Sequence, residues 1–332
     1  MSSTSVPDIL SFTKLSRNVS GLRTRLDTTR TETTTGRYED VTAQTKGDVG
    51  SVHLLKKAIG DVQYFQSSLL LVGSRAQITQ TTLGNIGSQG SRIATNLLSA
   101  VGLEDESTVN ILTGDARAAL LNTFASLNAK FGERAMFGGD ETDQAPLAPA
   151  TQLIADIEAI MAGATDAADA QAQLDTYFDD PAGGFATTIY LGGTNRSPAV
   201  EIGPGVRIDI SAKADDPAIK DIIRGLATIA SLSSATFTDR DAIIANGIDN
   251  VLDGETKLTE QRALIGVSEA RVEAAIKRFE LEETVLARLF NAKTARDPFE
   301  AASELQLLET QLEASYLMTA RLARLSLANF IR

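Results

Sequence analysis

Apolar residues near the N-terminus recur at alternating steps of three and four. These positions are Phe12, Leu15, Val19, Leu22 and Leu26, continued more weakly by Thr29 and Thr33. This spacing is the heptad repeat of a helix that packs against another helix. The threonine-rich run at residues 28–35, closed by Gly36, lowers helix propensity because β-branched side chains lose rotamer freedom. We therefore predict a first helix that ends or frays within this run.

The end of the sequence predicts a second long helix. Asp297, Pro298 and Glu300 supply an N-cap, a first-turn proline and an acid at the third helical position, and neither glycine nor proline follows. The apolar stripe consists of Ala301, Leu305, Leu308, Leu312, Tyr316, Ala320, Ala323, Leu327 and Phe330. Consecutive steps of four around Tyr316 should locally unwind a left-handed supercoil. Leu322 and Leu325 widen the stripe, which indicates contact with more than one neighbouring helix.

Two more heptad tracts lie between these ends and predict a helical rod. The first, from about Gly50 to Ala100, contains Val62, Phe65, Leu69, Val72, Ala76, Thr79, Leu83, Ile86, Gly90, Ile93 and Leu97. The second starts near Ala242 and contains Leu258, Ile265, Val272, Phe279 and Leu286, with Ile276 and Leu289 beside them. At 1.5 Å per residue the first tract would be roughly 75 Å long, more than a compact domain needs. A shorter helix is expected at about 115–130.

The region between these tracts, at about 140–235, has a different pattern. Apolar and polar residues alternate over Val200, Ile202, Val206, Ile208 and Ile210, which predicts strands. Together with residues 187–191 these would form a small antiparallel sheet, with turns at 192–193 and 203–205. Asp216 and Pro217 predict the N-cap and first residue of another helix.

These patterns predict a mainly α fold. Its long coiled-coil rod is formed by the N- and C-terminal segments, and a small α/β outer domain is inserted in the middle. We expect a terminal coiled-coil assembly domain at 1–42 and 297–332. The helical rod would cover 43–139 and 236–296, and the outer domain 140–235.

The composition favours helix packing and disfavours two kinds of partner. Hydrophobic residues make up 43% of the chain but aromatic residues only 5%, so Ala, Leu, Ile and Val must fill the core. The net charge is −12, and residues 140–260 alone carry −14, whereas residues 1–40 carry +1. The acidic middle repels phosphate, so we expect neither nucleic acid nor a membrane surface as partner.

The candidate chemical sites are few. There is no cysteine, and His53 is the only histidine, so we expect it to be a solvent-facing helix residue. The acidic pairs 179–180 and 215–216 each precede a proline and predict caps or turns rather than cation sites. The glycine pairs at 138–139, 183–184 and 192–193 predict turns, since none fits a phosphate loop. We predict no enzyme, no catalytic residue, no cofactor and no metal.

Two further absences concern the route out of the cell. No segment approaches the roughly 18 apolar residues that span a bilayer, and the first 30 residues have no apolar signal core. The chain is therefore expected either to stay in the cytoplasm or to leave by an export system that does not cleave its N-terminus.

Specific residues then indicate a family. The string at 299–330, above all Gln311–Tyr316 and Ser326–Phe330, closely resembles the terminal helix of the hook–filament junction proteins of the flagellin superfamily. Residues 131–147 resemble the segment in which that family leaves the rod for its outer domain, and Thr35 to Arg37 match its N-terminal turn. The family's usual Asp-Asp-Pro after that turn is replaced by Glu39, Asp40 and Val41.

This resemblance implies a structural axial protein of the bacterial flagellum that joins the hook to the flagellin filament. Its implied partners are other copies of itself, the hook-side junction protein, flagellin and a cytoplasmic export chaperone that binds the C-terminal helix. It implies type III export, an extracellular place at the hook–filament junction, and ends that are disordered before assembly. The assembly interface would be formed by Phe12, Leu15, Val19, Leu22, Leu26, Leu305, Leu308, Leu312, Tyr316, Leu322, Leu325, Leu327 and Phe330.

Alternatives remain at this point. The two end stripes could instead pack on each other within one chain. A filament flagellin shares most of the same features, and a cytoplasmic helical scaffold or signalling rod would have the heptads without any export. An enzyme would rest on the acidic middle alone, without a recognisable nucleophile and base.

Overall fold

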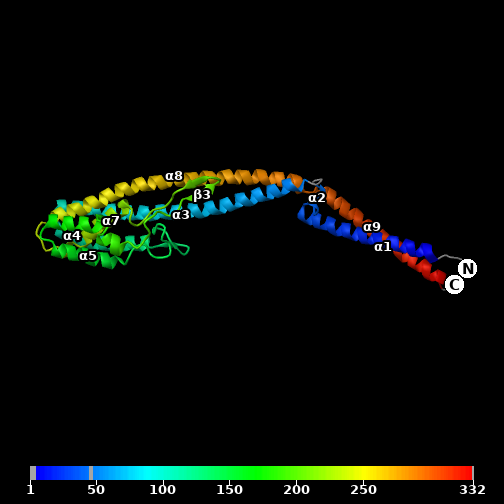
Figure 1. Ribbon diagram of the computed structural model, residues 1–332, viewed down its shortest axis with the longest axis horizontal. Helices are drawn as coiled ribbons and strands as arrows, with labels where there is room; N and C mark the ends of the chain where they lie inside the picture. The colour runs from blue at the N-terminus through cyan, green and yellow to red at the C-terminus, as the bar shows by residue number, and fades with distance from the viewer. Residues whose placement is uncertain (1–4, 45–47, 331–332) are drawn as a thin grey trace. The chain divides into compact units, whose positions relative to one another are not determined.

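The computed structural model describes residues 5–44 and 48–330, and most of them are helical, as predicted. The chain forms two compact units. Residues 1–64 and 279–332 form what we call the end unit, and residues 65–278 form the middle unit. Two long helices, α3 (Val49–Gly102) and α8 (Arg240–Thr294), contribute to both units (Figure 1). Within the described ranges, we find no helix whose length and apolar character would let it span a bilayer.

The first helix of the end unit, α1, runs over Ser5–Thr35 and includes the whole threonine-rich run. Threonine hydroxyls donate to carbonyls one turn earlier, at 2.7 Å from Thr33 to Thr29 and 2.9 Å from Thr35 to Thr31. These bonds satisfy the hydroxyls without breaking the helix. Gly36 then adopts a φ of 68°, and the helix ends there. The helix therefore runs through the threonine-rich run without breaking and ends at its last residue, before Gly36. A short helix α2 (Val41–Gln44) follows.

The other end helix, α9, covers Pro298–Phe330. It starts as predicted, because Asp297 Oδ1 accepts hydrogen bonds from the backbone N–H groups of Phe299 at 2.8 Å and Glu300 at 3.0 Å. Figure 1 shows α1 and α9 side by side. Both ends are thus helical in this structure, which differs from the disorder that the family resemblance implies for the unassembled chain.

In the middle unit, α3 and α8 lie along each other, and the predicted heptad seams are the buried ones. Leu69, Leu83 and Leu97 on α3 are fully buried. Leu258, Ile265 and Val272 on α8 are each less than 5% exposed. Glycines on α3 bring the two helices close together. A Cβ on Gly90 would lie 3.1 Å from Val251, and one on Gly87 would lie 3.2 Å from Leu258. The period of the sequence therefore identified this packing correctly.

Shorter helices fill the rest of the middle unit. They are α4 (Glu106–Leu127), α5 (Ala150–Gly163), α6 (Ala167–Asp179) and α7 (Pro217–Ala230). Helix α4 begins about nine residues earlier than expected, because Asp105 caps it by accepting from Thr108 N at 3.1 Å. Helix α7 is buried on nearly all sides, and its Gly225 lies against the backbone of α8 at Gly247.

The prediction of a three-segment sheet is wrong for one of its segments. Strands β3 (Val200–Gly203) and β4 (Val206–Ile208) pair antiparallel as expected. Residues 187–191 do not join them, because Phe185–Ile189 forms a π-helix and only Tyr190 makes a single bridge, to Leu147. The hydroxyls of Thr187 and Thr188 donate to the carbonyls of Gly183 and Gly184, four residues earlier. These threonines therefore form hydrogen bonds within a helical turn and not across a sheet. A second short hairpin pairs β1 (Lys130–Phe131) with β2 (Arg134–Ala135).

The acidic pairs serve local structure in two different ways. Asp180 forms the expected turn by accepting from Ala182 N at 2.8 Å, whereas Asp179 forms ion pairs with Lys220 and Arg224. Asp216 stands at the N-cap of α7, but its carboxylate does not cap the helix. It accepts instead from Arg196 at 2.7 Å, from Gln261 at 2.7 Å and from Lys213 N at 2.9 Å.

Candidate assembly interface

The two predicted end stripes face each other within one chain. Arg25 binds Glu304 at 2.9 Å and Arg23 Nε donates to the Tyr316 hydroxyl at 2.6 Å, so α1 and α9 run antiparallel. On α9, Leu308 is 1% exposed and Leu305 and Leu312 are half-buried. On α1 the half-buried residues are Leu15, Val19, Leu22 and Leu26. Intramolecular packing therefore accounts for the central part of both stripes.

The residues of the α9 stripe become more exposed toward the C-terminus. Tyr316 is 40% exposed and Leu322 is 45% exposed, although both belong to the predicted set. The side chains of Phe12, Leu325, Leu327 and Phe330, also predicted, lie outside the described residues. The exposed fraction thus rises along α9 from its buried start, and α1 covers the stripe incompletely.

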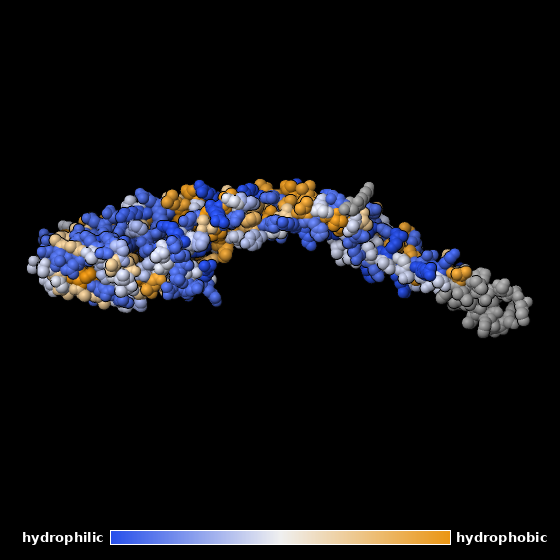
Figure 2. Space-filling model, in the orientation of Figure 1, coloured by the Kyte–Doolittle hydropathy of each residue, from blue (hydrophilic) through white to orange (hydrophobic). Residues whose placement is uncertain are grey.

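Helix α9 carries further exposed apolar residues beside the stripe, and the heptad analysis missed them. Phe299 is 82% exposed, Leu307 is 56% exposed, and Leu317 and Met318 are each 60% exposed. These positions lie off the 3/4 stripe, but Leu307 and Met318 are eleven residues apart, close to three full turns, so they share one side of the helix. Figure 2 shows hydrophobic residues on the surface of the end unit. Exposed apolar residues gathered in this way are typical of a surface that a partner covers.

A groove of about 520 Å³ lies between α1 and α9. Apolar Leu15, Leu22 and Met318 line it together with the small residues Gly21 and Ala314. Arg17 and Arg25 stand at its edge. Small residues let another helix approach closely, so the groove and the exposed face offer two places for neighbouring helices.

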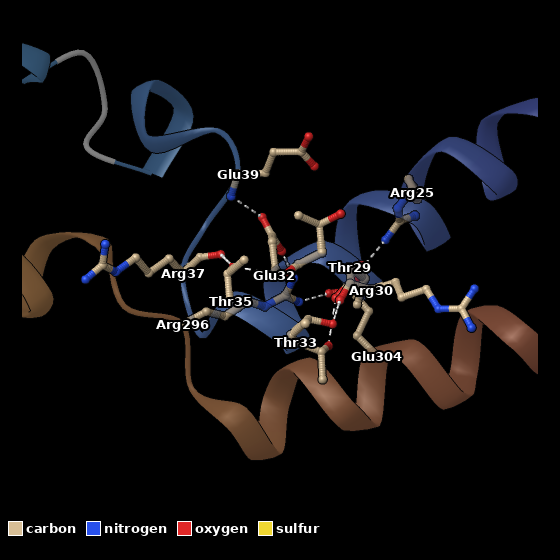
Figure 3. A network of polar contacts seen from close by, with 12 residues as sticks. Arg25, Thr29, Arg30, Glu32, Thr33, Thr35, Arg37, Glu39, Arg296 and Glu304 are labelled. Carbon is tan, nitrogen blue, oxygen red and sulfur yellow. Dashed lines mark hydrogen bonds and ion pairs between the residues drawn. The ribbon is translucent and has the colours of Figure 1, made fainter.

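The base of the pair is fixed by a buried ionic cluster, which Figure 3 shows. Arg296 is 7% exposed and binds the carboxylates of both Glu32 and Glu304, and Glu32 is 6% exposed. The guanidinium also lies over the ring of Tyr38, 5.6 Å from its centroid. The heptad analysis gave no signal for this cluster, because Glu32 and Arg296 are charged residues outside the apolar stripes.

Backbone contacts join the same two segments. Arg296 N donates to Gly36 O at 3.0 Å, and Tyr38 N donates to Thr294 O at 3.0 Å. Glu39 N donates to Glu32 Oε1 at 2.8 Å, which occupies the oxygen that Arg296 leaves free (Figure 3). These contacts tie the turn after α1 to the turn before α9. We call them, together with the ion pairs of Arg296 with Glu32 and Glu304, the clamp.

Glu304 is a carboxyl group of this cluster whose pKa is lowered by its arginine partners. The hydrogen bond from Arg25 is the main cause that lowers the pKa of Glu304 below its ordinary value of 4.5, and Arg296 adds to it while burial opposes it. A carboxyl group with a lowered pKa stabilises the fold above its unfolded pKa. That contribution is lost as the pH falls through the folded pKa.

We expect the Glu304→Gln variant to show a weaker loss of end-unit stability on acidification than the natural chain. The reason is that the variant lacks the carboxyl group whose protonation weakens its bonds to Arg25 and Arg296. Measuring the free energy of unfolding of the end unit from about pH 6 to pH 3 tests this. Parallel pH profiles of the two chains would contradict it.

Among the residues that the structure describes, no group of three or more His, Asp or Glu side chains is placed to hold a metal ion. His53 is exposed on α3, as predicted. What the end unit presents is a buried ionic clamp, an incompletely covered seam and an exposed apolar face.

Comparison with protein families defines the class of the C-terminal part. Residues 248–331, about a quarter of the chain, match the family described as bacterial flagellin C-terminal helical region. The matched range includes all of α9 and most of α8. Arg296, Glu304 and the exposed apolar residues of α9 lie within the matched range.

Two solved structures illustrate the similarity of the fold to known proteins. A flagellar hook-associated protein from Vibrio parahaemolyticus is 12% identical, with a TM-score of 0.49 over 73% of this chain and 95% of that one. FlgL from Bacillus cereus is 13% identical, with a TM-score of 0.36 over 75% of this chain and 96% of that one. A search of curated proteins finds no match.

Proposed function

We propose that this chain is a structural axial protein of the bacterial flagellum that joins the hook to the flagellin filament by subunit assembly. The flagellin C-terminal helical region at residues 248–331 is the observation that carries this proposal. The resemblance of residues 299–330 to the terminal helix of hook–filament junction proteins favours the junction over the filament. The protein would act extracellularly, without a substrate and without a cofactor.

The proposed partners follow from the place in the flagellum. They are other copies of this chain, the hook-side junction protein and flagellin, with an export chaperone on the C-terminal helix before secretion. The paired helices of residues 1–42 and 297–332 would form the assembly domain. Residues 43–139 and 236–296 would form the rod, and residues 140–235 the outer domain.

Different residues of the end helices are suited to contacts within the chain and to contacts between chains. Buried seam residues such as Leu308 hold α1 to α9, whereas Leu317 and Met318 remain 60% exposed in the single chain. Covering such a side chain fully contributes about 1.5–3 kcal/mol, so several of them supply a useful part of a subunit contact. We therefore assign the intermolecular contact to the exposed face of α9 and to the open end of the stripe.

We expect the double variant Leu317→Asp/Met318→Asp to fold normally and to lose most of its incorporation into flagella. Both side chains are exposed in the single chain, so acids there cost little stability but would be desolvated in a contact. The measurement compares the amount of the chain on sheared flagella with its amount in the medium. Ser303→Asp, an exposed position on the same helix, is the matched control and should leave incorporation unchanged. Equal incorporation of all three chains would remove the assignment.

Deletion of the gene tests the proposed function itself and separates it from the nearest rival. The match to a flagellin region also suits a filament flagellin. Cells that lack a junction protein should still export flagellin, and the flagellin should accumulate in the medium as monomer. Cells that lack their sole flagellin should release none. A deletion strain with normal filaments would refute the proposal. In cells with the gene intact, finding the chain only in the cytosol and never on sheared flagella would refute it as well.

A further inference from the structure

Helix α4 in the middle unit has an exposed apolar stripe opposite its buried face. Ile111 is 64% exposed and Leu121 is 42% exposed, and Gly114, Ala118 and Ala125 between and beyond them are exposed as well. The steps of three and four place all five on one side of the helix. A Cβ on Gly114 would meet no atom within 4 Å, so the space over the stripe is open.

A groove of about 690 Å³ lies elsewhere in the middle unit, between α8 and the β3–β4 hairpin. Its floor contains the buried residues Ile208 and Ile265, and its wall contains Leu264 at 72% exposure and Val267 at 52%. The Ser268 hydroxyl donates to Asp209 O at 2.9 Å, which holds the strand end on the helix. Figure 2 shows hydrophobic residues on the surface over α8.

Charges distinguish the groove from the stripe. Arg207 and Arg271 line the groove, and neither forms an ion pair with any residue in the described part of the chain. The other two cations there are already paired, Arg196 with Asp216 at 2.7 Å and Lys257 with Asp221 at 2.6 Å. The stripe is flanked by Asp115, an exposed acid that likewise has no ion pair within the described ranges. Asp209 and Glu260 also line the groove without an ion pair in the described part of the chain, so its unpaired charges are of both signs. Arg271 lies at one end of the α8 wall and Glu260 at the other, whereas α4 offers a negative charge.

We propose that this groove binds helix α4 of a second copy of the chain. The wall from Leu264 to Arg271 spans one heptad, about 10 Å, as does the segment from Gly114 to Leu121 on α4. Gly114 and Ala118 let the helices approach closely, while Ile111 and Leu121 fill the apolar ends of the contact. Asp115 then lies beside Arg271, and the acid Glu260 at the other end of the groove fixes the direction of the docked helix.

The contact has a consequence for assembly, because the two surfaces are different parts of the same unit. A heterologous contact of this kind leaves one groove and one stripe free after each addition, so it generates rings or helical arrays rather than closed dimers. The inference rests on the proposed function only in that it requires many copies side by side. It concerns the middle unit, whereas the proposed function is tested at the end unit and by deletion.

The chain has no cysteine, so single introduced cysteines report this contact directly. One chain carries Ala118→Cys on α4 and a second carries Val267→Cys in the groove, both exposed positions. The two are co-expressed in cells that lack their own copy, and flagella are sheared and mildly oxidised. The same mixture is oxidised as purified full-length chains at high concentration. We expect the mixed disulfide dimer to exceed each like-with-like dimer about tenfold, since only close Cα atoms can be bridged.

The matched control replaces Ala118→Cys by Ala172→Cys, an exposed position on α6, and should give no excess of mixed dimer. Mixed dimers at the control level in both settings, or a predominance of Ala118→Cys dimers with themselves, would overturn the inference. The amount of chain on sheared flagella is read from the same samples. Its absence there, with cross-linking in solution intact, would refute the proposed function and leave the contact standing.

A charge exchange separates a specific contact from chance collision. Asp115→Arg in the α4 chain should reduce the mixed dimer about threefold to tenfold, because it places like charges together. Arg271→Asp in the groove chain should restore it. Neither exposed substitution should change the helix content measured by circular dichroism. Loss of cross-linking without rescue would show that Asp115 and Arg271 do not meet.

Discussion

Replacement of Arg296 by methionine should destabilise the α1–α9 pair by about 3–5 kcal/mol. The substitution removes the partner of Glu32, a carboxylate that is 6% exposed and would then be a buried charge with only the Glu39 N–H to satisfy it. It also removes one of the two arginine partners of Glu304. The cost therefore comes more from leaving the buried Glu32 carboxylate without a charged partner than from losing the ion-pair energy itself.

Hydrogen exchange of the α1 amides measures this effect locally. A change of 3–5 kcal/mol corresponds to a loss of protection of about 10²- to 10⁴-fold where exchange follows the opening equilibrium. Amides of α7, in the middle unit, should be unaffected. The double variant Glu32→Leu/Arg296→Met removes both charges and should recover most of the protection, because apolar replacement of a buried pair is often close to neutral. Unchanged exchange in Arg296→Met would mean that the clamp does not hold the pair.

Gly225→Val should prevent the middle unit from folding stably. A Cβ on Gly225 would lie 2.4 Å from the carbonyl oxygen of Gly247 and 2.9 Å from the backbone nitrogen of Val251. Backbone atoms of α8 cannot rotate away as a side chain can, so α7 would have to move out of the core. Overpacking usually costs about 1–3 kcal/mol, and we expect a cost at or above the top of that range here.

The measurement is the denaturant midpoint of the middle unit, followed by the exchange of α7 amides. Gly114→Ala on α4 is the control, since a Cβ there meets no atom within 4 Å. That change should stabilise the unit by up to about 1 kcal/mol through helix propensity. A Gly225→Val chain with an unchanged midpoint would show that α7 and α8 cross less closely than described.

Periodicity predicted the helices well because packing along a rod is a local pattern. The seams through Leu69, Leu83 and Leu97 and through Leu258, Ile265 and Val272 were identified from spacing, and all six residues are buried. The Asp297 cap was equally visible, since its partners are the next few residues. In both cases the residues that determine the structure are close together in sequence.

Features that depend on distant residues were not predictable in this way. The glycine pairs at 138–139 and 192–193 were expected to be turns, but they also let two loops interlock. A Cβ on Gly139 would lie 2.4 Å from Asn195 O, and Gly193 N donates to Gly138 O at 2.8 Å. Residues 187–191 alternate like a strand, yet the packing of Phe185 and Ile189 inside the unit makes them helical.

The coverage of the candidate interface also depends on residues far apart in the sequence. A sequence pattern does not say whether the chain itself or a neighbour covers each residue of the stripe. Leu308 is 1% exposed in the single chain, whereas Leu317, outside the stripe, is 60% exposed. The clamp joins residues about 264 positions apart, and no local signal links Glu32 to Arg296.

The pairing of α1 with α9 sets the order in which a newly made chain can mature. Arg23 and Tyr316 are 293 residues apart, so α1 leaves the ribosome long before its partner exists. At about 5–20 residues per second this interval lasts tens of seconds, and closing so long a loop then costs further entropy. The middle unit is complete by residue 278 and is free to fold first. Until translation ends, the first helix stays a single amphipathic segment, open to any cellular factor that binds apolar faces.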